Sequence, residues 1–463
     1  MYDTWREKRL LPPPAFVVRN DNVMSVGWIV LDLYHLPPHC LVYIIYCVVL
    51  QLQRYSLGGS IVAGPIDKFL SLFNLKESIY SIVLLAGQDG TLAVLYRFLS
   101  TNDGKILKFY SEHREVTTKV IGGPTYDNPE KLEAVLDSLL SPIKKKIKPE
   151  KRSETKLNMF AVPNNPIWQN PRKEEMLQTC KTFCCKCGLR PARFPVTLVS
   201  EKDRRLLSWF TVNLITNRLC KSPKRMVTAV MLGRQTCFVA LAVNKKNDIV
   251  KGSEAFFDEI NLFSRFFKIY SQSYEELGIE NFRKNIMQCN TKSTTFISDC
   301  IYPGMEVEWK YNNTVYKITG SSGKPQDVMV GDIKTRVSVI EPDNCLKAIQ
   351  RALKETIPPQ YPCSKIVYGL DYFIKILTDA KVIKKTGEKI RLIDIYSRAY
   401  TLCGMKDTER PFQCFDLLYV FALLRDFFGM KENRKIHLRP TVGGMTVNWM
   451  FGAAFASLQQ NSL

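Results

Sequence analysis

Apolar residues in this chain recur with two different periods. Continuous or alternating apolar runs between polar turns predict β-strands, which fall at residues 82–85, 92–98, 106–110, 158–162, 227–232 and 236–243. Apolar residues spaced three or four apart predict helices, which fall at residues 129–140, 173–184, 204–218, 274–287, 343–356, 371–377, 393–402 and 415–428. Strands that alternate with helices along most of the chain indicate an α/β fold.

A glycine-containing turn separates the first two predicted strands. It reads Gly87-Gln88-Asp89-Gly90-Thr91. Two strands around a Gly-x-x-Gly turn form a hairpin whose backbone N–H groups can converge on an anion. Most hairpins of this kind bind nothing, so the turn alone is weak evidence for a phosphate site.

Four segments of the chain, in order, resemble sequence signatures of the apyrase family, the ectonucleoside triphosphate diphosphohydrolases. The first is Leu85-Ala86-Gly87-Gln88-Asp89-Gly90-Thr91, which is similar to the family's Asp-Ala-Gly-Ser-Ser-Gly-Thr. Residues 199–213 resemble the third signature, Gly-Gln-Glu-Glu-Gly-Ala-Tyr-Gly-Trp-Ile-Thr-Ile-Asn, with Trp209 and Asn213 in matching places. Residues 229–236 resemble the fourth, Ala-Leu-Asp-Leu-Gly-Gly-Ala-Ser, and residues 447–454 resemble the fifth around Trp449. The second signature is hardly recognisable at residues 160–164.

The resemblance extends from about Lys76 to the C-terminus and implies a domain organisation. Proteins of this family fold into two ribonuclease-H-like (actin-like) domains, and the nucleotide lies in the cleft between them. We therefore expect domain I at residues 60–193 plus 440–463 and domain II at residues 194–439, after an N-terminal tail at residues 1–25.

An apolar segment at residues 26–52 precedes the region of resemblance. Its uncharged part, residues 40–50, is shorter than the roughly 20 residues that span a bilayer, and basic residues lie upstream of it. The segment fits a signal-anchor, a cleaved signal peptide or a buried hairpin. Because the resembling family often carries an N-terminal anchor, we expect attachment to a membrane through this segment.

Three pairs of cysteines also resemble the family, in which pairs at similar places of the second domain form disulfides. The pairs are Cys289 with Cys300, Cys345 with Cys363, and Cys403 with Cys414. Disulfides form in oxidising compartments, and the sequon that starts at Asn312 would be glycosylated there. We therefore expect the protein in the lumen of the secretory pathway or at the cell surface.

A separate cysteine cluster, Cys180, Cys184, Cys185 and Cys187, raises the question of a metal site. Zinc sites usually combine two pairs of ligands, and no second Cys or His pair at a fitting spacing follows. These cysteines are expected to be core residues, with one or two of them in disulfides. We assign no metal site.

The charge of the chain favours an anionic partner. Lys and Arg outnumber Asp and Glu by 65 to 44, which gives a net charge of +21. Nucleotides, phosphate, lipid head groups and nucleic acids all satisfy this preference. Because the basic residues are scattered and no groove-reading motif is present, we expect no nucleic-acid partner.

The residues that carry catalysis in the apyrase family are replaced in this chain. The family's catalytic base is the second Glu of the third signature, and that position is Arg204 here. An arginine stays protonated and cannot accept a proton from water. Leu85 and Met231 occupy the positions of two carboxylates that organise the metal and the water. Mg²⁺ or Ca²⁺ would therefore lack oxygen ligands.

Residues that bind the nucleotide itself are better matched. Phosphate contacts are expected from backbone N–H groups and cationic side chains of the two glycine turns, namely Gly87, Gln88, Asp89, Gly90, Thr91, Gly233, Arg234 and Gln235. The family stacks the nucleobase between two aromatic rings, and Tyr372 and Tyr419 fall near those places. A stacked base would gain about 1 kcal/mol from the rings.

These observations lead to one expected function and two alternatives. The expected function is a pseudoenzyme of the apyrase family that binds a nucleotide or phosphate in the inter-domain cleft without a metal. The first alternative is an active nucleoside di- or triphosphate hydrolase that uses Mg²⁺ or Ca²⁺ and shifted carboxylates, Asp89, Asp203 or Glu201. The second alternative is a partner-binding module whose cleft has filled in.

Overall fold

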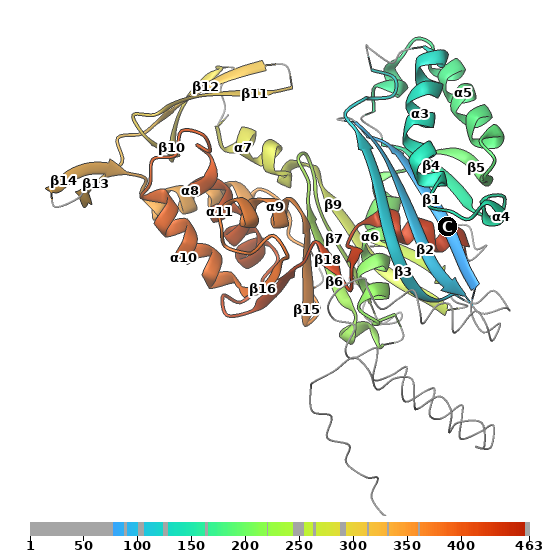
Figure 1. Cartoon of the computed structure of the whole chain (residues 1–463). Helices are drawn as coiled ribbons and strands as arrows, with labels where there is room; N and C mark the ends of the chain where they lie inside the picture. Colours follow the sequence, from blue (N-terminus) through green and yellow to red (C-terminus); the bar gives the residue numbers. More distant parts are fainter. Residues whose placement is uncertain are drawn as a thin grey trace, which may run out of the picture. The chain divides into compact units, whose positions relative to one another are not determined.

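The computed structural model describes most of the chain from residue 77 onward (Figure 1). The described residues are 77–87, 90–100, 106–123, 128–162, 165–219, 221–243, 254–262, 265–287, 293–312, 314–330, 333–359 and 362–458. All of them belong to one compact unit, Ser71–Leu463. The apolar segment at residues 26–52 and its expected membrane attachment lie outside the described residues. Among the helices described, none combines the length and the apolar character of a membrane span.

The first sheet has five strands in the order β3-β2-β1-β4-β5. Their bounds are β1 Glu77–Ala86, β2 Thr91–Ser100, β3 Ile106–Thr117, β4 Lys156–Ala161 and β5 Arg190–Leu198. Strands β1, β2 and β3 form an antiparallel meander, and β4 and β5 extend the sheet in parallel beside β1.

The second sheet has seven strands in the order β16-β17-β15-β6-β7-β9-β8. Their bounds are β6 Val227–Leu232, β7 Cys237–Ala242, β8 Phe257–Leu262, β9 Arg265–Tyr274, β15 Ile366–Asp371, β16 Glu388–Arg391 and β17 Lys435–Leu438. Strands β6, β7 and β9 are antiparallel, and β15 and β17 continue in parallel beside β6. The order β9-β7-β6-β15-β17 thus repeats the order and directions of the whole first sheet.

Helices cover both faces of the first sheet. Helices α3 (Pro129–Lys144) and α5 (Lys173–Lys186) pack on one face, and α12 (Trp449–Leu458) packs on β1 and β4 on the other. Helix α6 (Glu201–Ile215) packs against α12 and against β6, β7 and β9 of the second sheet. Figure 1 shows α6 in green and α12 in red next to each other. One apolar core therefore joins α6, α12 and the facing sides of both sheets.

The opposite face of the second sheet carries five helices. They are α7 Ile279–Met287, α8 Pro342–Lys354, α9 Tyr372–Asp379, α10 Leu392–Cys403 and α11 Gln413–Ala422. Strand β6 is buried on both faces: Val230 and Leu232 belong to the core under these helices, whereas Met231 belongs to the core shared with α6. This two-sided burial explains why its sequence is apolar apart from Thr228, whose hydroxyl donates to Ser364 Oγ (3.0 Å).

One short helix and the strands of three small sheets remain. They are α4 Pro149–Arg152, β10 Thr295–Pro303, β11 Glu306–Tyr311, β12 Thr314–Gly320, β13 Lys324–Val330, β14 Ile333–Val339, β18 Thr441–Val442 and β19 Met445–Thr446. Strands β10, β11 and β12 form a small sheet whose apolar side packs on Phe412.

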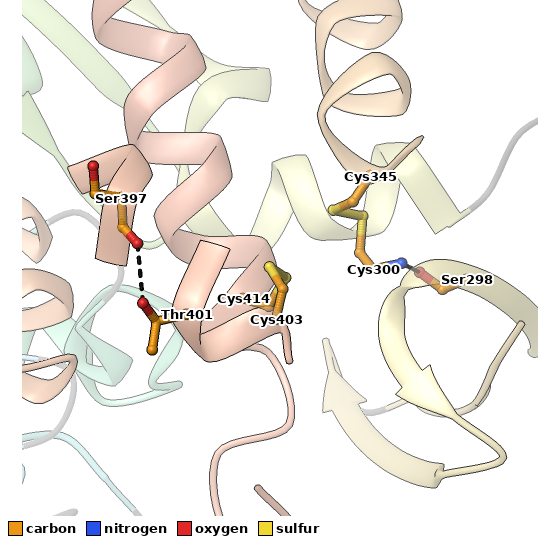
Figure 2. Close-up of a disulfide and its surroundings, with 7 residues drawn as sticks. All are labelled: Ser298, Cys300, Cys345, Ser397, Thr401, Cys403 and Cys414. Carbon is orange, nitrogen blue, oxygen red and sulfur yellow. Dashed lines mark hydrogen bonds between the residues drawn. A yellow bond between two sulfur atoms is a disulfide. The ribbon is translucent and has the colours of Figure 1, made fainter. Parts of the chain in front are cut away.

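Two disulfides stabilise the part of the unit around α8, α10 and α11 (Figure 2). Cys403–Cys414 joins the end of α10 to the start of α11, as expected. The second bond is Cys300–Cys345, between β10 and α8. The predicted pairs Cys289–Cys300 and Cys345–Cys363 are therefore wrong, because chain spacing does not show which strand approaches α8. Cys363 is a buried free thiol, and residue 289 lies outside the described residues.

The cysteines near the end of α5 are all free thiols. Cys180 and Cys184 are buried in the core between α5 and the first sheet, while Cys185 is exposed and Cys187 is half-buried. The expectation of core residues is confirmed for the first two. None of the four forms a disulfide, so the expectation that one or two of them are disulfide partners is wrong.

Candidate functional site

A cavity of about 890 Å³ lies where the β1–β2 turn, the β6–β7 turn, the start of α6 and the start of α9 meet. The β11–β12 turn and Trp449 complete its wall. Both glycine turns predicted to bind phosphate border this cavity. It is open and has not been filled by apolar side chains, although Leu85 and Leu92 are part of its lining.

The β1–β2 turn is a tight turn that requires glycine. The N–H of Gly87 donates to the carbonyl of Gly90 (2.9 Å), and Asn165 Nδ2 donates to the carbonyl of Gly87 (2.7 Å). A Cβ on Gly90 would lie 2.4 Å from the carbonyl oxygen of Thr117, so a larger residue would displace β3. Gln88 and Asp89, at the tip of the turn, lie outside the described residues.

The hydroxyl of Thr91 does not face the cavity as a free donor. Thr91 is buried, and its Oγ1 donates to the carbonyl of Lys119 (2.8 Å). This bond ties the beginning of β2 to the segment after β3. Thr91 therefore lines the cavity as a structural residue of the turn.

The β6–β7 turn is fixed by the first residues of α7. The N–H of Ile279 donates to the carbonyl of Gly233 (3.0 Å), and that of Glu280 donates to the carbonyl of Arg234 (2.8 Å). In a trans peptide the carbonyl and the following N–H point in opposite directions. The N–H groups of Arg234 and Gln235 therefore point away from α7, and both residues line the cavity.

Arg204 places a positively charged guanidinium group in the cavity wall. It lies in the first turn of α6, and its Nε atom is buried without a hydrogen-bond partner among the described residues. A buried donor that makes no hydrogen bond is costly, so the site favours a ligand that accepts from it. Leu85 lies in the same cavity wall. Met231, the third position at which the sequence predicts a lost carboxylate, is buried in the core and is not part of the cavity lining.

Arg234 is held at the rim of the cavity by an ion pair. Its Nε lies 3.0 Å from Oε1 of Glu280, and both side chains line the cavity. The pair orients the guanidinium group beside the β6–β7 turn, although surface pairs of this kind contribute little to stability.

The shifted carboxylates considered as replacement bases have different positions. Asp203 belongs to the N-terminal cap of α6, where its Oδ2 accepts from the N–H of Ser200 (3.2 Å) and its own N–H donates to Ser200 Oγ (3.1 Å). It does not line the cavity, so its expected role as a base is not supported. Glu201 does line the cavity.

The two aromatic residues expected to stack on a base lie in different environments. Tyr372, in the first turn of α9, lines the cavity. Tyr419 is fully buried, stacks on Phe282 at 4.1 Å and donates its hydroxyl hydrogen to the carbonyl of Leu277. Its expected role in stacking is wrong because nearly all of α11 is buried, and Tyr419 lies in the core and not in the cavity lining.

Asp371 is a cavity residue that the sequence did not reveal. It occupies the sharp turn between β15 and α9 with φ 57° and ψ −116°, a conformation that is strained for a residue with a side chain. The turn is close, since a Cβ on Gly369 would lie 3.3 Å from the Cβ of Phe373. The signal in the sequence is a charged residue that directly follows the apolar residues 366–370 and begins the helix predicted at 371–377.

Asp371 is an exposed residue of the cavity lining, yet its carboxyl group is surrounded by protein atoms. This partial loss of hydration raises its pKa, and the nearby positive charge of Arg204 acts in the opposite direction. Among the described residues no cluster of three or more His, Cys, Asp or Glu side chains could hold a metal ion. Acidic and basic groups thus face each other in the cavity without forming a metal site in the described part of the chain.

The sequon residue Asn312 also borders the cavity. It is exposed in the β11–β12 turn with φ 46°, and Lys310 lines the cavity just before it. Glycosylation of Asn312 remains a prediction.

Comparison with known proteins agrees with this architecture. The sequence model of the GDA1/CD39 (nucleoside phosphatase) family matches residues 72–463. The chain is 23% identical to the human nucleoside diphosphate phosphatase ENTPD5 over 394 residues, which cover 83% of the chain and 88% of the relative. It is 25% identical to the Caenorhabditis elegans nucleoside-diphosphatase uda-1 over 415 residues, which cover 83% of each protein.

A solved structure with a similar fold is a nucleoside triphosphate hydrolase from Neospora caninum. The TM-score is 0.56 at 10% sequence identity, and the match covers 85% of this chain and 94% of that one. The expected α/β, actin-like fold is confirmed. Since the family model matches most of the chain, the protein is a diverged member of the GDA1/CD39 (nucleoside phosphatase) family.

Proposed function

We propose that the protein binds a nucleoside di- or triphosphate in the cavity through backbone N–H groups and guanidinium groups, without metal-dependent hydrolysis. The observation that carries this proposal is Arg204, whose Nε is buried beside an open cavity and has no partner among the described residues. A phosphate oxygen would accept this hydrogen bond with charge assistance.

Backbone geometry supports the phosphate assignment. The β6–β7 turn directs the N–H groups of Arg234 and Gln235 away from α7, and successive N–H groups on one side of a turn favour an anion. Tyr372 lies in the same cavity and supplies a ring for the base. The names of the two relatives, a nucleoside diphosphate phosphatase and a nucleoside-diphosphatase, agree with this ligand class.

The residues of the cavity also support the absence of metal-dependent turnover. Hydrolysis of a phosphoanhydride needs a group that orients and deprotonates water and a cation that neutralises charge. Arg204 cannot deprotonate water, and Leu85 offers no oxygen ligand. We therefore propose a pseudoenzyme, with Mg²⁺ or Ca²⁺ playing no part in ligand binding.

The compartment is proposed on separate grounds. Cys300–Cys345 and Cys403–Cys414 favour the oxidising lumen of the secretory pathway or the cell surface. Membrane attachment through residues 26–52 completes this part of the proposal.

Binding and turnover are tested together on the purified full chain. We expect ADP or UDP to raise the melting temperature in the presence of EDTA, and Arg204→Met to abolish most of that rise. We expect no release of phosphate with Mg²⁺ or Ca²⁺. Nucleotides that leave the melting temperature unchanged would rule out the binding proposal, and metal-dependent turnover would rule out the pseudoenzyme.

One observation favours the hydrolase alternative enough to test it. Glu201 lines the cavity, so a carboxylate remains at the start of α6. If the protein hydrolyses nucleotides, Glu201→Gln or Asp89→Asn should abolish turnover, whereas Asp203→Asn should not, because Asp203 serves the helix cap.

A further inference from the structure

We propose that Asp371 binds the ribose hydroxyl groups of the nucleotide and selects ribonucleotides over deoxyribonucleotides. This inference rests on the proposed function, because it assumes that phosphates lie at the β6–β7 turn and the base lies against Tyr372. The inference assigns a role to the carboxyl group of Asp371, which lines the cavity and has no role in the proposed function.

The position of Asp371 follows from the second sheet. Strands β15 and β6 are parallel neighbours, and Asp371 is paired with Leu232, the residue before Gly233. Asp371 therefore lies one strand away from the phosphate turn. In the chain it directly precedes Tyr372. A nucleotide with its phosphates at one place and its base at the other must pass its sugar between them, next to Asp371.

The backbone of Asp371 is the second observation. Its φ of 57° is a conformation that glycine adopts freely and that a side chain makes costly. The strain is unnecessary for the turn itself, since glycine would make the same turn without it. A carboxylate held in this strained turn, and facing a cavity, indicates that the side chain contacts a ligand.

The chemistry of the carboxylate fits a sugar. A carboxylate accepts hydrogen bonds and donates none when ionised, and the two neighbouring hydroxyls of ribose supply two donors. Acidic residues bind the ribose hydroxyl in dinucleotide sites for the same reason. Burial raises the pKa of the Asp371 carboxyl group, and the positive charge of Arg204 opposes this rise by favouring the ionised form. Glu280, another carboxylate of the cavity, already pairs with Arg234.

The test compares ADP and UDP with their 2′,3′-dideoxy analogues on the full chain by calorimetry. We expect each ribonucleotide to bind about tenfold more tightly or better, as for hydrogen bonds to a charged group. In Asp371→Gly both forms should bind with equal affinity, close to that of the dideoxy analogue for the unaltered protein. Asp371→Asn should show an intermediate preference, because its amide oxygen still accepts from one hydroxyl.

Folding and binding are separated by the melting temperature. Asp371→Gly should melt no lower than the unaltered protein, since glycine relieves the strained φ. Glu409→Gln is the matched control, because Glu409 is an exposed carboxylate outside this cavity and should leave the ribose preference unchanged.

Each result decides between the two proposals. Equal affinity for ribonucleotide and dideoxynucleotide in the unaltered protein overturns the ribose assignment and leaves nucleotide binding intact. A ribose preference that survives in Asp371→Gly also overturns it. Failure of all nucleotides to bind overturns the proposed function and this inference together.

Discussion

Single residues decide what the cavity can bind. Arg204 supplies a permanent positive charge, Leu85 an apolar side chain, and Asp371 a carboxyl group at the end of β15. The backbone frame around them depends on the two glycine turns, whose close contacts leave little room for a Cβ. The site therefore combines a backbone frame that depends on glycine with side chains that decide its chemistry.

Introducing carboxylates one by one should separate their effects on stability from their effects on catalysis. Met231→Asp places a charge in the apolar core shared by both sheets, so we expect it to lower the free energy of unfolding by about 3 kcal/mol or more. Arg204→Glu, at the cavity, should be tolerated. Urea unfolding of each variant measures this difference.

The same variants address activity. The triple variant Leu85→Asp, Arg204→Glu, Met231→Asp should stay nearly inactive, because Arg234 would still hold a phosphate in its ground state. Turnover that appears in the triple variant and is unaffected by an added Arg234→Gly would contradict this view.

His437 in β17 gives the fold a pH dependence. The ring stacks on Tyr368 at 4.8 Å, and its burial, followed by the charges of Lys389, Arg439 and Arg218, lowers its pKa to about 4. A histidine with a lowered folded pKa opposes protonation in the folded state. The contribution of His437 to the free energy of unfolding is therefore fully present above pH 6.5 and is lost as the pH falls from about 6.5 towards 4.

Replacing the ring tests this contribution. His437→Phe keeps the stacking and removes the titration, so its unfolding free energy should fall less between pH 7.5 and pH 5 than that of the unaltered protein. Urea unfolding at both pH values is the measurement. Equal losses in the two proteins would show that other groups cause the pH dependence.

At the scale of elements, local sequence signals were sufficient where they were strong. The predicted strands around both glycine turns and the amphipathic helices α3, α5, α8 and α10 are all present. The helix predicted from residue 274 begins five residues later, at Ile279, because Tyr274 completes the long strand β9. Strands β10 to β14 were not predicted, although β11–β12 and β13–β14 are hairpins of neighbouring segments, because charged and polar residues interrupt the apolar pattern of these strands.

In the candidate site, too, local sequence signals predicted some residues correctly and missed those that depend on tertiary structure. Signatures located both glycine turns and Arg204, because these depend on residue order alone. Asp371 was missed, since its significance lies in a backbone angle, and Tyr419 was misplaced, since burial on all faces of α11 is a tertiary property.

The N-terminal cap of α6 explains another boundary. The helix starts at Glu201, three residues before the predicted start, because Ser200 and Asp203 exchange hydrogen bonds as a capping box. Ser200→Ala should lower the free energy of unfolding by about 1 kcal/mol. Nucleotide affinity should not change, since Ser200 is outside the cavity lining. Urea unfolding together with calorimetric titration of ADP would detect either deviation.

The two disulfides should differ in their effect on stability. Cys300–Cys345 closes a separation of 45 residues and Cys403–Cys414 one of 11. The entropy of the closed loop predicts that replacing the first pair by alanine costs about 1 kcal/mol more than replacing the second. Thermal unfolding of both double variants measures this, and non-reducing peptide mapping of the unaltered protein checks the pairing.

At the scale of the whole molecule, the net charge of +21 acts on every anionic ligand. Long-range attraction is screened by salt, with a Debye length of about 10 Å at 0.1 M ionic strength. We expect the affinity for ADP to fall when NaCl is raised from 50 to 500 mM, and to fall more for ATP, which carries more charge. Calorimetric titration at both salt concentrations tests this, and affinities independent of salt would exclude a general electrostatic contribution.

Helices α6 and α12 each pack on the sheet that is farther away in the sequence, and this limits where the chain can be cut into fragments. Helix α6 follows the first sheet in the sequence but packs on β6, β7 and β9, and α12 follows the second sheet but packs on β1 and β4. A fragment ending after α6 would lack the helix that covers its own sheet, and so would the remainder. Cleaved between α6 and β6, the two pieces should each be insoluble when produced alone and should recover a native assembly only when produced together, as obligate halves of one folded body.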